Sequence, residues 1–323
     1  MKIRNNLILM DTQALKNLLR RYSLKPNFTY GQNFLLDDEV LDEIVSAAAV
    51  TSADQILEIG PGIGNLTRRL CEKALNHDGT GQAGFVLSIE KDPKFLPILK
   101  AIKKDYPKNF RYEIADALEF DFQQALSERR MTVAAELNAE SNVQRPISVP
   151  ISDLSASYKV VANIPYYITG KILEMFMTAK LKPATIVVLT QKEVAERITA
   201  RAGDLSLLAI SVQLFGNPKI IKKVPAKSFY PAPKVDSAIV RIDLPEEPKY
   251  KIDNEKNFFR ILRACFSGKR KQLHNTLVNN LGIDKHQVFE ILAKLKINPA
   301  SRPQELTIEK WIDLHNKILN PKL

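Results

Sequence analysis

A short apolar run that leads into three alternating glycines, residues 55–64, constrains this chain more than any other feature. Gly60, Gly62 and Gly64 follow the strand-like QILEI, and a helical period begins at Asn65. Glycine lets the backbone turn sharply and approach a ligand without a side-chain clash. A strand, a glycine turn and a helix in this order predict a ligand-binding turn. A NAD-binding turn and a purely structural tight turn are the alternatives.

Strand-like and helix-like segments alternate along the next part of the chain. Strands are expected at residues 55–60, 84–90, 111–116, 158–165 and 184–191, and helices at 65–75, 94–104, 170–180 and 192–201. Proline-rich turns join two further strands, at residues 220–230 and 235–244. The pattern predicts an α/β, Rossmann-like fold with a mainly parallel, doubly wound sheet.

Changes in composition suggest how the chain is divided. We expect an N-terminal extension over residues 1–30, a catalytic domain over 31–245 and a small all-α domain over 246–323. A charged, proline-containing linker marks the second boundary near Pro245. Residues 127–157 are polar and have no clear period, which predicts a surface insertion between the third and fourth strands.

Composition also bears on partners. The 47 lysines and arginines exceed the 36 acidic residues, giving a net charge of +11, which favours a polyanionic partner. Without an amphipathic terminal anchor or an apolar run of about 18 residues, we expect a cytoplasmic protein that binds nucleic acid and no membrane. Cys71 and Cys265 lie far apart and without histidine neighbours, so we predict no metal site and two small buried hydrophobes.

Two acidic residues end the strands that follow the glycine turn. Glu90 ends the second strand, where it can accept hydrogen bonds from both ribose hydroxyls of a nucleoside, and Asp116 ends the third, where it can accept from an adenine amine. Either acid alone is equally consistent with a solvated strand end or a helix cap. Glu58 directly before the turn would repel a pyrophosphate and tolerate ammonium and sulfonium groups. Together these residues favour S-adenosylmethionine over NAD.

The tetrapeptide Asn163-Ile164-Pro165-Tyr166 after the fourth strand is the most specific motif. An exocyclic adenine amine is a poor nucleophile because its lone pair is delocalised into the ring. The Asn163 side-chain oxygen and the Ile164 carbonyl can accept its two hydrogens and aim the lone pair at a methyl carbon. Pro165 stiffens the turn, and Tyr166 can stack on the base. An ordinary asparagine-proline turn with a core tyrosine is the alternative.

An aromatic residue later in the chain is a candidate for the opposite wall of the base site. Phe229 in SFYPAPKV is predicted to sandwich an extruded adenine, with Tyr230 as the alternative. Simple packing of Phe229 against the proline-rich turn is an equally good interpretation.

Seven segments, in this order, resemble the ribosomal RNA adenine dimethyltransferases of the KsgA/RsmA type: GQNFLLD, EIGPGIGNLT, SIEKD, IAD, NIPYYITGKIL, FYPAPKVDSAIV and FSGKRKQLHNTL. The resemblance runs from about residue 30 to residue 314. It implies that the 31–37 segment folds over the methionine end of S-adenosylmethionine. It also implies a cofactor site made of Asn33, Leu35, Gly60, Glu90, Asp116 and Asn163.

The resemblance further implies a substrate. In this family two neighbouring adenines of a hairpin near the 3′ end of small-subunit ribosomal RNA each receive two methyl groups. We therefore expect a partner in the assembling 30S-type subunit and a protein that acts as a monomer. Candidate phosphate contacts are Lys222, Lys223, Lys227, Lys234, Lys269, Arg270 and Lys271.

Three other functions remain as alternatives to this prediction. An Erm-type enzyme would methylate large-subunit RNA with the same motifs, although the C-terminal segments resemble the KsgA type. A ribosome-assembly factor without catalysis would not need the paired amine acceptors of residues 163–166. A NAD-dependent oxidoreductase is the most distant alternative.

Overall fold

The computed structural model describes residues 11–27, 31–75, 84–128, 158–268 and 270–320, and only the backbone of Tyr166. The chain forms two compact units. Unit 1 comprises residues 1–192 and 220–244, and unit 2 comprises residues 193–219 and 245–323. Unit 2 thus includes residues 193–219, which the sequence prediction placed in the catalytic domain.

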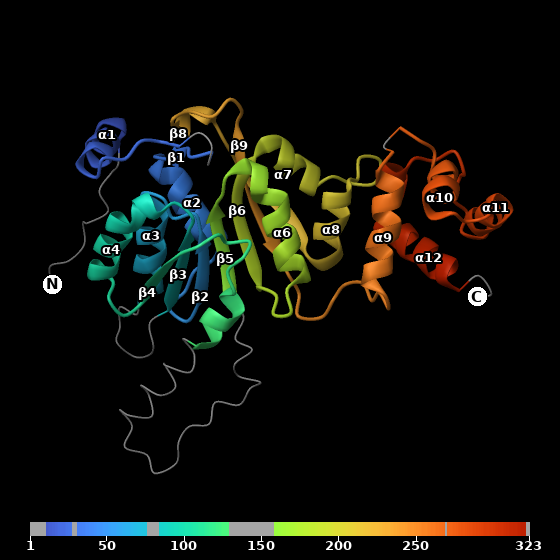
Figure 1. Ribbon diagram of the computed structural model, residues 1–323, viewed down its shortest axis with the longest axis horizontal. Coiled ribbons are helices and arrows are strands. Elements are labelled where there is room, and N and C mark those ends of the chain that lie inside the picture. Colours follow the sequence, from blue (N-terminus) through green and yellow to red (C-terminus); the bar gives the residue numbers. More distant parts are fainter. Residues whose placement is uncertain (1–10, 28–30, 76–83, 129–157, 269, 321–323) are drawn as a thin grey trace, which may run out of the picture. The chain divides into compact units, whose positions relative to one another are not determined.

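A seven-stranded sheet, ordered β4-β3-β2-β5-β6-β9-β7, is formed by the described residues (Figure 1). Its strands are β2 Gln55–Ile59, β3 Phe85–Glu90, β4 Phe110–Ile114, β5 Tyr158–Asn163, β6 Thr185–Gln191, β7 Asn217–Val224 and β9 Ser237–Asp243. The strands from β4 to β6 are parallel, and β9 is antiparallel to β6. The predicted doubly wound sheet, with a strand pair late in the chain, is confirmed.

The order of the strands reverses at the junction of β2 and β5. The chain builds outward from β2 to β4, returns to β5 on the other side of β2, and continues to β6. Right-handed crossovers then place α3 (Asn65–Ala74) and α4 (Leu96–Asp105) on one face of the sheet and α6 (Thr169–Thr178) on the other. Ligands of such sheets bind at the carboxyl ends of the strands, next to the reversal.

Two helices precede the sheet in the chain and belong to unit 1. In α1 (Thr12–Arg21), Leu15 and Leu19 are buried in the same apolar cluster as Ile44 of α2 (Asp38–Ala47). The predicted N-terminal extension therefore contains a helix that packs on the core of unit 1. The sequence prediction did not include α1.

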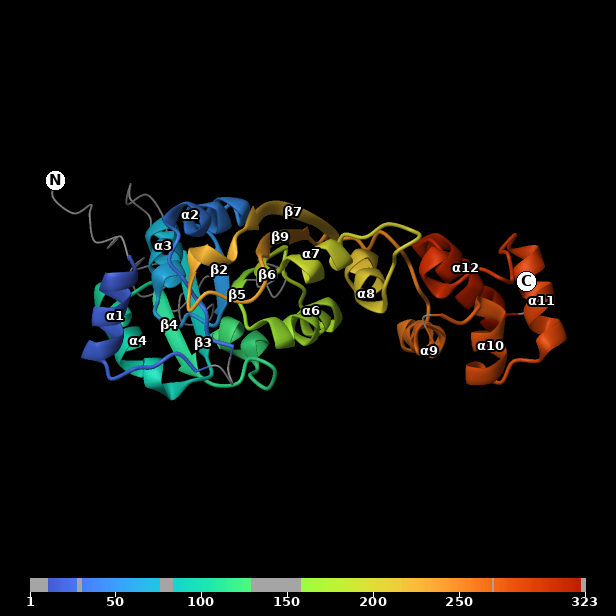
Figure 2. The same cartoon turned by 90° about the horizontal axis from the view of Figure 1, so that it is seen from above.

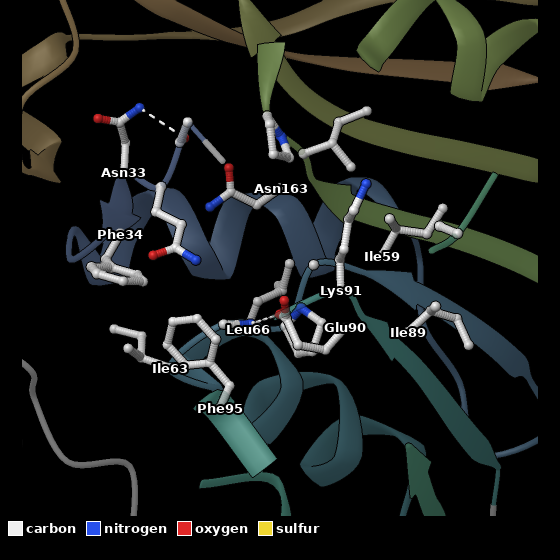
Figure 3. Close-up of a pocket in the computed structure, with 18 of the residues that line it drawn as sticks. Asn33, Phe34, Ile59, Ile63, Leu66, Ile89, Glu90, Lys91, Phe95 and Asn163 are labelled. Atoms are coloured by element: carbon white, nitrogen blue, oxygen red, sulfur yellow. Dashed lines mark hydrogen bonds between the residues drawn. The ribbon is translucent and has the colours of Figure 1, made fainter. Parts of the chain in front are cut away.

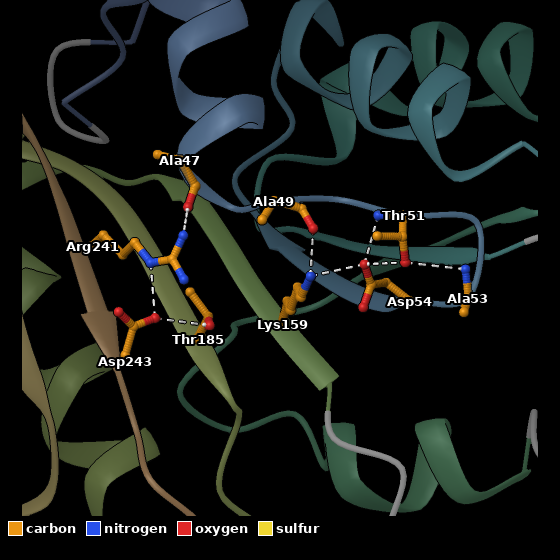
Figure 4. Close-up of polar contacts among 9 residues, drawn as sticks. All are labelled: Ala47, Ala49, Thr51, Ala53, Asp54, Lys159, Thr185, Arg241 and Asp243. Atoms are coloured by element: carbon orange, nitrogen blue, oxygen red, sulfur yellow. Dashed lines mark hydrogen bonds and ion pairs between the residues drawn. The ribbon is translucent and has the colours of Figure 1, made fainter.

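Two basic side chains of the sheet bind the end of α2 and the loop that follows it (Figure 4). Arg241 of β9 donates through Nη1 to the Ala47 carbonyl at 2.7 Å, which satisfies a carbonyl at the helix terminus. Lys159 of β5 donates through Nζ to the Ala49 carbonyl at 2.6 Å and forms a 2.8 Å ion pair with Asp54. These contacts fix the position of α2, which contributes Leu41 to the pocket described below.

The prediction of one continuous strand over residues 220–230 is wrong. The strand β7 ends at Val224, and Pro225, which has no N–H to donate, precedes a 3₁₀ turn. The chain then forms the two-residue strand β8 (Phe229–Tyr230), which is antiparallel to β1 (Phe34–Leu35). This short pair joins two segments that lie almost 200 residues apart in sequence.

Apart from residues 217–219, with which β7 begins, the regular elements described in unit 2 are helices (Figure 2). Its helices are α7 Lys192–Ile198, which begins one residue before the boundary, α8 Leu207–Phe215, α9 Glu255–Phe266, α10 Leu273–Leu281, α11 Lys285–Lys294 and α12 Ile308–Leu319. The sequence predicts α7 and α9 to α12. The apolar LLAISVQLF of α8 has no clear polar face, so its periodicity gives little signal. No helix in the described residues is long and apolar enough to span a bilayer.

Large apolar side chains are buried in unit 2. Trp311, Phe258 and Leu262 are almost fully buried. Cys265 is buried here, as Cys71 is in unit 1, which agrees with the prediction that both cysteines are small hydrophobes.

The predicted insertion at 127–157 lies, except for its first two residues, outside the described residues.

Candidate active site

A pocket that is open to solvent lies at the carboxyl ends of the parallel strands (Figure 3). Its walls come from residues 31–35, the glycine turn after β2, and the ends of β3, β4 and β5. The strand reversal between β2 and β5 therefore positions the pocket. The residues predicted to hold a cofactor all line it: Asn33, Leu35, Gly60, Glu90, Asp116 and Asn163.

The three glycines of the turn all have a positive φ, at +74° for Gly60, +53° for Gly62 and +80° for Gly64. A Cβ at Gly60 would lie 3.3 Å from the Asn163 carbonyl oxygen, so glycine allows the two strand ends to approach. A Cβ at Gly64 would overlap the side chain of Ile102 in α4. The turn therefore depends on glycine for its conformation and its packing.

The carboxylate of Glu90 is the best-fixed polar group of the pocket. Its Oε2 accepts from the Gly62 backbone N–H at 3.0 Å, and its Oε1 accepts from the Asp92 N–H at 2.8 Å. Burial raises the pKa of Glu90, and these two backbone hydrogen bonds oppose that shift. A carboxylate offers about four lone-pair positions, so Glu90 can still accept hydrogen bonds from a ligand.

Asp116 lies two residues after β4 and forms part of the same pocket. Its Oδ2 is 2.7 Å from Lys91 Nζ, and its Oδ1 accepts from the Leu118 N–H at 3.0 Å. The hydrogen bond from Lys91 lowers the pKa of Asp116, so this carboxylate remains an acceptor at neutral pH. Lys91, which sequence reasoning did not single out, is thus a further residue of the site.

The segment before α2 closes one side of the pocket. Asn33 donates through Nδ2 to the Gly31 carbonyl at 3.2 Å, which tightens the turn. The Leu35 carbonyl accepts from Asn65 Nδ2 in α3 at 3.1 Å, so the segment is tied to the first turn of α3. Asp37 then caps α2. The segment thus contacts elements on two sides of the pocket.

Apolar side chains that the sequence analysis did not assign form much of the remaining wall. Phe34 and Phe95 meet edge to face, with ring centroids 5.9 Å apart. Ile63, Leu66 and Ile89 also line the pocket. Apolar residues such as these give no distinctive sequence signal, because any buried helix or strand contains them. Apolar walls with a few fixed polar groups are typical of a small-molecule site.

The tetrapeptide predicted to be catalytic leaves β5 at the edge of the pocket. Asn163 ends β5, pairs in register with Leu189 of β6, and lines the pocket together with Ile164 and Pro165. No hydrogen bond described for this structure uses the side-chain amide of Asn163, which remains available to a ligand. The side chain of Tyr166 lies outside the described residues, so its stacking role stays a prediction.

Phe229 is not among the described residues that line this pocket. It is 5% exposed in β8, where it pairs with Leu35 and joins the apolar cluster of unit 1. Of its two interpretations in the sequence, the structure favours packing. Tyr230, its alternative, packs against the same cluster and lies beneath Lys16 at 5.5 Å from ring centroid to Nζ.

The prediction that Glu58 faces the ligand is wrong. Glu58 is fully buried in β2 and is absent from the described lining of the pocket. Its Oε2 accepts from Ser88 Oγ of β3 at 2.5 Å. Burial raises the pKa of Glu58 to about 7. Residues alternate between the two faces of a strand, and Glu58 is directed into the core of unit 1 rather than into the pocket.

The candidate phosphate contacts are divided between the two units. Lys223, Lys227 and Lys234 are exposed in unit 1, and Lys222 is half-exposed. In unit 2 a polar groove is lined by Arg270, Lys271, Gln272, Asn275, Asn279, Ala300 and Arg302. Lys269 lies outside the described residues. Basic and amide side chains in one groove are groups that bind phosphates.

Comparison with known proteins identifies the family. The family model described as "Ribosomal RNA adenine dimethylase" matches residues 23–319. The chain belongs to this family. It is 38% identical over 296 residues to the "Ribosomal RNA small subunit methyltransferase A" of Dehalococcoides mccartyi (strain CBDB1), with 92% of this chain and 89% of the relative covered.

Two solved structures are also similar. A dimethyladenosine transferase from Plasmodium falciparum is 25% identical, with a TM-score of 0.65, and the match covers 87% of this chain and 95% of the other. The 23S rRNA methyltransferase ErmE is 24% identical, with a TM-score of 0.60, and the match covers 89% of this chain and 100% of ErmE. The likeness to ErmE shows a shared fold alone. The KsgA/RsmA resemblance of the sequence is confirmed by the family match and the relatives.

Proposed function

We propose that this chain transfers methyl groups from S-adenosylmethionine to the exocyclic N6 amine of adenines in small-subunit ribosomal RNA, two to each adenine. The observation that carries the proposal is the position of Asn163. Its unengaged amide, followed by the Ile164 carbonyl, lies on the pocket that also contains Glu90. An amine acceptor and a nucleoside acceptor thus share one cavity.

The pocket fits the cofactor of the family. Glu90, held by two backbone N–H groups, is placed to accept from ribose hydroxyls, and Asp116 from the adenine amine. Lys91 is the one basic residue among those that line the pocket, and it is paired with Asp116. The pocket therefore lacks, within its described lining, the cationic cradle that a dinucleotide pyrophosphate prefers. When bound, S-adenosylmethionine supplies an electrophilic methyl carbon.

The residues of the corner after β5 position the nucleophile. The Asn163 side-chain oxygen and the Ile164 carbonyl accept the two amine hydrogens, which turns the nitrogen lone pair toward the methyl carbon. Pro165 restricts the backbone of the corner. Because the end of β5 and Pro165 fix the backbone of the corner, the Ile164 carbonyl needs little reorganisation during transfer. Solvent removes the proton that the amine releases.

We propose further that unit 2 binds ribosomal RNA through its polar groove, with residues 246–323 as the RNA-binding domain and 31–245 as the catalytic domain. Support comes from Arg270, Lys271 and Arg302, which line that groove. Each phosphate neutralised would steepen the salt dependence of RNA binding. In the finer proposal, the substrate is two adjacent adenines of a 3′-terminal hairpin, and the enzyme is a cytoplasmic monomer. The net charge of +11 supports an RNA partner.

Methylation of purified ribosomal subunits tests the substrate. Unmethylated small and large subunits are incubated with the protein and isotope-labelled S-adenosylmethionine, and digested RNA is analysed for dimethyladenosine by mass spectrometry. We expect N6,N6-dimethyladenosine in the small subunit. Label confined to the large subunit would instead support the Erm-type alternative, which shares the fold of ErmE and the motifs.

The Asn163→Ala variant tests the chemistry. Removing one preorganised partner of the reacting group is expected to lower kcat by roughly 100-fold or more. Asn217→Ala, an exposed asparagine at the start of β7, is the matched control. Turnover of Asn163→Ala equal to that of the control would show that the acceptor role is wrong. If dimethyladenosine forms in neither the small nor the large subunit, the result would favour a ribosome-assembly factor without catalysis.

A further inference from the structure

Tyr167 is the most exposed of the large hydrophobic side chains that the structure describes, with 61% of its surface accessible. It is also part of the pocket wall, two residues after Pro165 and within the 3₁₀ turn Tyr166–Ile168. The function proposed above assigns it no role. A large aromatic ring in solvent at the rim of a site is a surface on which a ligand can stack.

The ring of Tyr167 lies close to the segment that closes the pocket. A Cβ at Gly31 would lie 3.7 and 3.8 Å from two carbons of the ring, and 3.3 Å from Pro165 Cβ. Gly31 has a φ of +61°, which favours glycine at this position. One side of the ring therefore faces a backbone position that carries no side chain. The rest of its surface remains accessible.

We propose that Tyr167 stacks on an unpaired RNA base that neighbours the adenine in the active site. This proposal rests on the RNA methyltransferase function proposed above. Single-stranded RNA is recognised mainly by stacking of splayed bases on aromatic side chains. The target adenine must reach Asn163 inside the pocket, whereas Tyr167 lies at its mouth, so the ring meets a different nucleotide. Because every base has a π-face, the contact positions the strand without reading its sequence.

Stacking by Tyr167 is a substrate-positioning role, and it predicts a specific pattern of losses. Tyr167→Ala should raise KM for RNA about 10-fold, since one stacked base is lost. Tyr167→Phe keeps the ring and should remain within about 2-fold of the original protein. The dissociation constant for S-adenosylmethionine should be unchanged in both variants. Ile114→Ala, an exposed apolar residue of unit 1 outside the described lining of the pocket, is the control.

The decisive test uses a set of hairpin RNAs that contain two adjacent adenines. In each RNA, the fluorescent base 2-aminopurine occupies one of the positions that flank these adenines. When the original protein binds, we expect the fluorescence to be quenched at one of these positions. This quenching should be lost in Tyr167→Ala and retained in Tyr167→Phe. An abasic residue at that position should raise KM for the original protein and leave Tyr167→Ala unaffected, because the stacking partner is already absent.

Three outcomes would overturn the proposal: equal quenching in the original protein and Tyr167→Ala, additive effects of the variant and the abasic residue, or a parallel loss of cofactor affinity. The last would assign Tyr167 to the cofactor site. The fluorescence titration requires no methyl transfer, so it reports on Tyr167 even when the RNA is not methylated. A failure of the proposed function itself would appear separately, as absence of dimethyladenosine in the subunit assay.

Discussion

The backbone N–H of Gly62 donates a 3.0 Å hydrogen bond to Oε2 of Glu90, which joins the glycine turn after β2 to the acidic end of β3. The turn and the acid are usually considered as separate parts of a nucleoside site. Here they form one unit, because the residue that accepts from a ligand also fixes the turn beside it. A change at Glu90 should therefore affect both.

Glu90→Gln is expected to weaken binding of S-adenosylmethionine by about 10-fold or more, because a charged acceptor is lost. The glutamine amide group cannot accept from the N–H groups of Gly62 and Asp92 at once, so one of them loses its partner. Isothermal titration calorimetry measures the dissociation constant. Glu113→Gln on the adjacent strand β4, outside the described lining of the pocket, is the control. An affinity within 2-fold of the control would contradict the role of Glu90.

Asp116 should discriminate between adenine and its deaminated analogue. Its lowered pKa keeps it an acceptor, which suits the adenine amine and opposes the carbonyl oxygen of hypoxanthine. We expect the original protein to bind S-adenosylhomocysteine at least about 10-fold more tightly than S-inosylhomocysteine. Asp116→Asn, which can donate, should narrow that preference. Competition binding measures both ligands, and an unchanged ratio in the variant would place the adenine elsewhere.

Much of the site was predictable because parallel strands deliver their carboxyl ends to one edge of a sheet. Gly60, Glu90, Asp116 and Asn163 each follow or end a strand of the predicted sheet, and all of them line the pocket. Alternation of strands and helices was therefore enough to bring together residues that are about 100 positions apart. No contact between individual side chains had to be known.

The remaining residues depend on contacts that periodicity does not report. Two-residue strands such as β1 and β8 are too short to show a pattern, so the packing of Phe229 against Leu35 could not be predicted. Glu58 lies next to the turn in sequence, but its orientation depends on which face of β2 it occupies. Lys91 and Tyr167 lie within segments that carry the family resemblance, but no role was assigned to them, and only their position on the pocket identified them.

Replacement of Gly64 should destabilise the turn. In Gly64→Ala the residue keeps a φ near +80°, and the added Cβ overlaps Ile102, so the free energy of unfolding should fall by roughly 1–3 kcal/mol. Gly170 provides a matched control within α6, since a Cβ there meets no atom within 4 Å. Gly170→Ala should raise stability by up to about 1 kcal/mol. Urea denaturation measures both, and equal effects would show that the turn tolerates a side chain.

The buried Glu58 gives the last prediction its physical basis. Its carboxyl group interacts with Ser88 of β3 and Thr67 of α3, and the charge that acts on its pKa is that of Glu90, which raises it further. Cys71 of α3 also faces it, and burial raises the pKa of that thiol. With no cation among these neighbours in the described residues, the protonated form of Glu58 is favoured. Its pKa of about 7 follows from burial first.

Glu58→Gln should change how stability depends on pH. The folded protein holds the Glu58 proton up to about pH 7, whereas the unfolded chain releases it near 4.5. The folded state thus binds more protons in this interval, and the free energy of unfolding falls as pH rises through it, by roughly 3 kcal/mol from this group. Glutamine is neutral at every pH, so the free energy of unfolding of the variant should not show this fall. Relative to the original protein, the variant should therefore be more stable at pH 8 than it is at pH 5. Urea denaturation at both values measures the difference, with Glu113→Gln as control. Parallel losses in Glu58→Gln and in the original protein would mean that Glu58 is already ionised in the fold at pH 5.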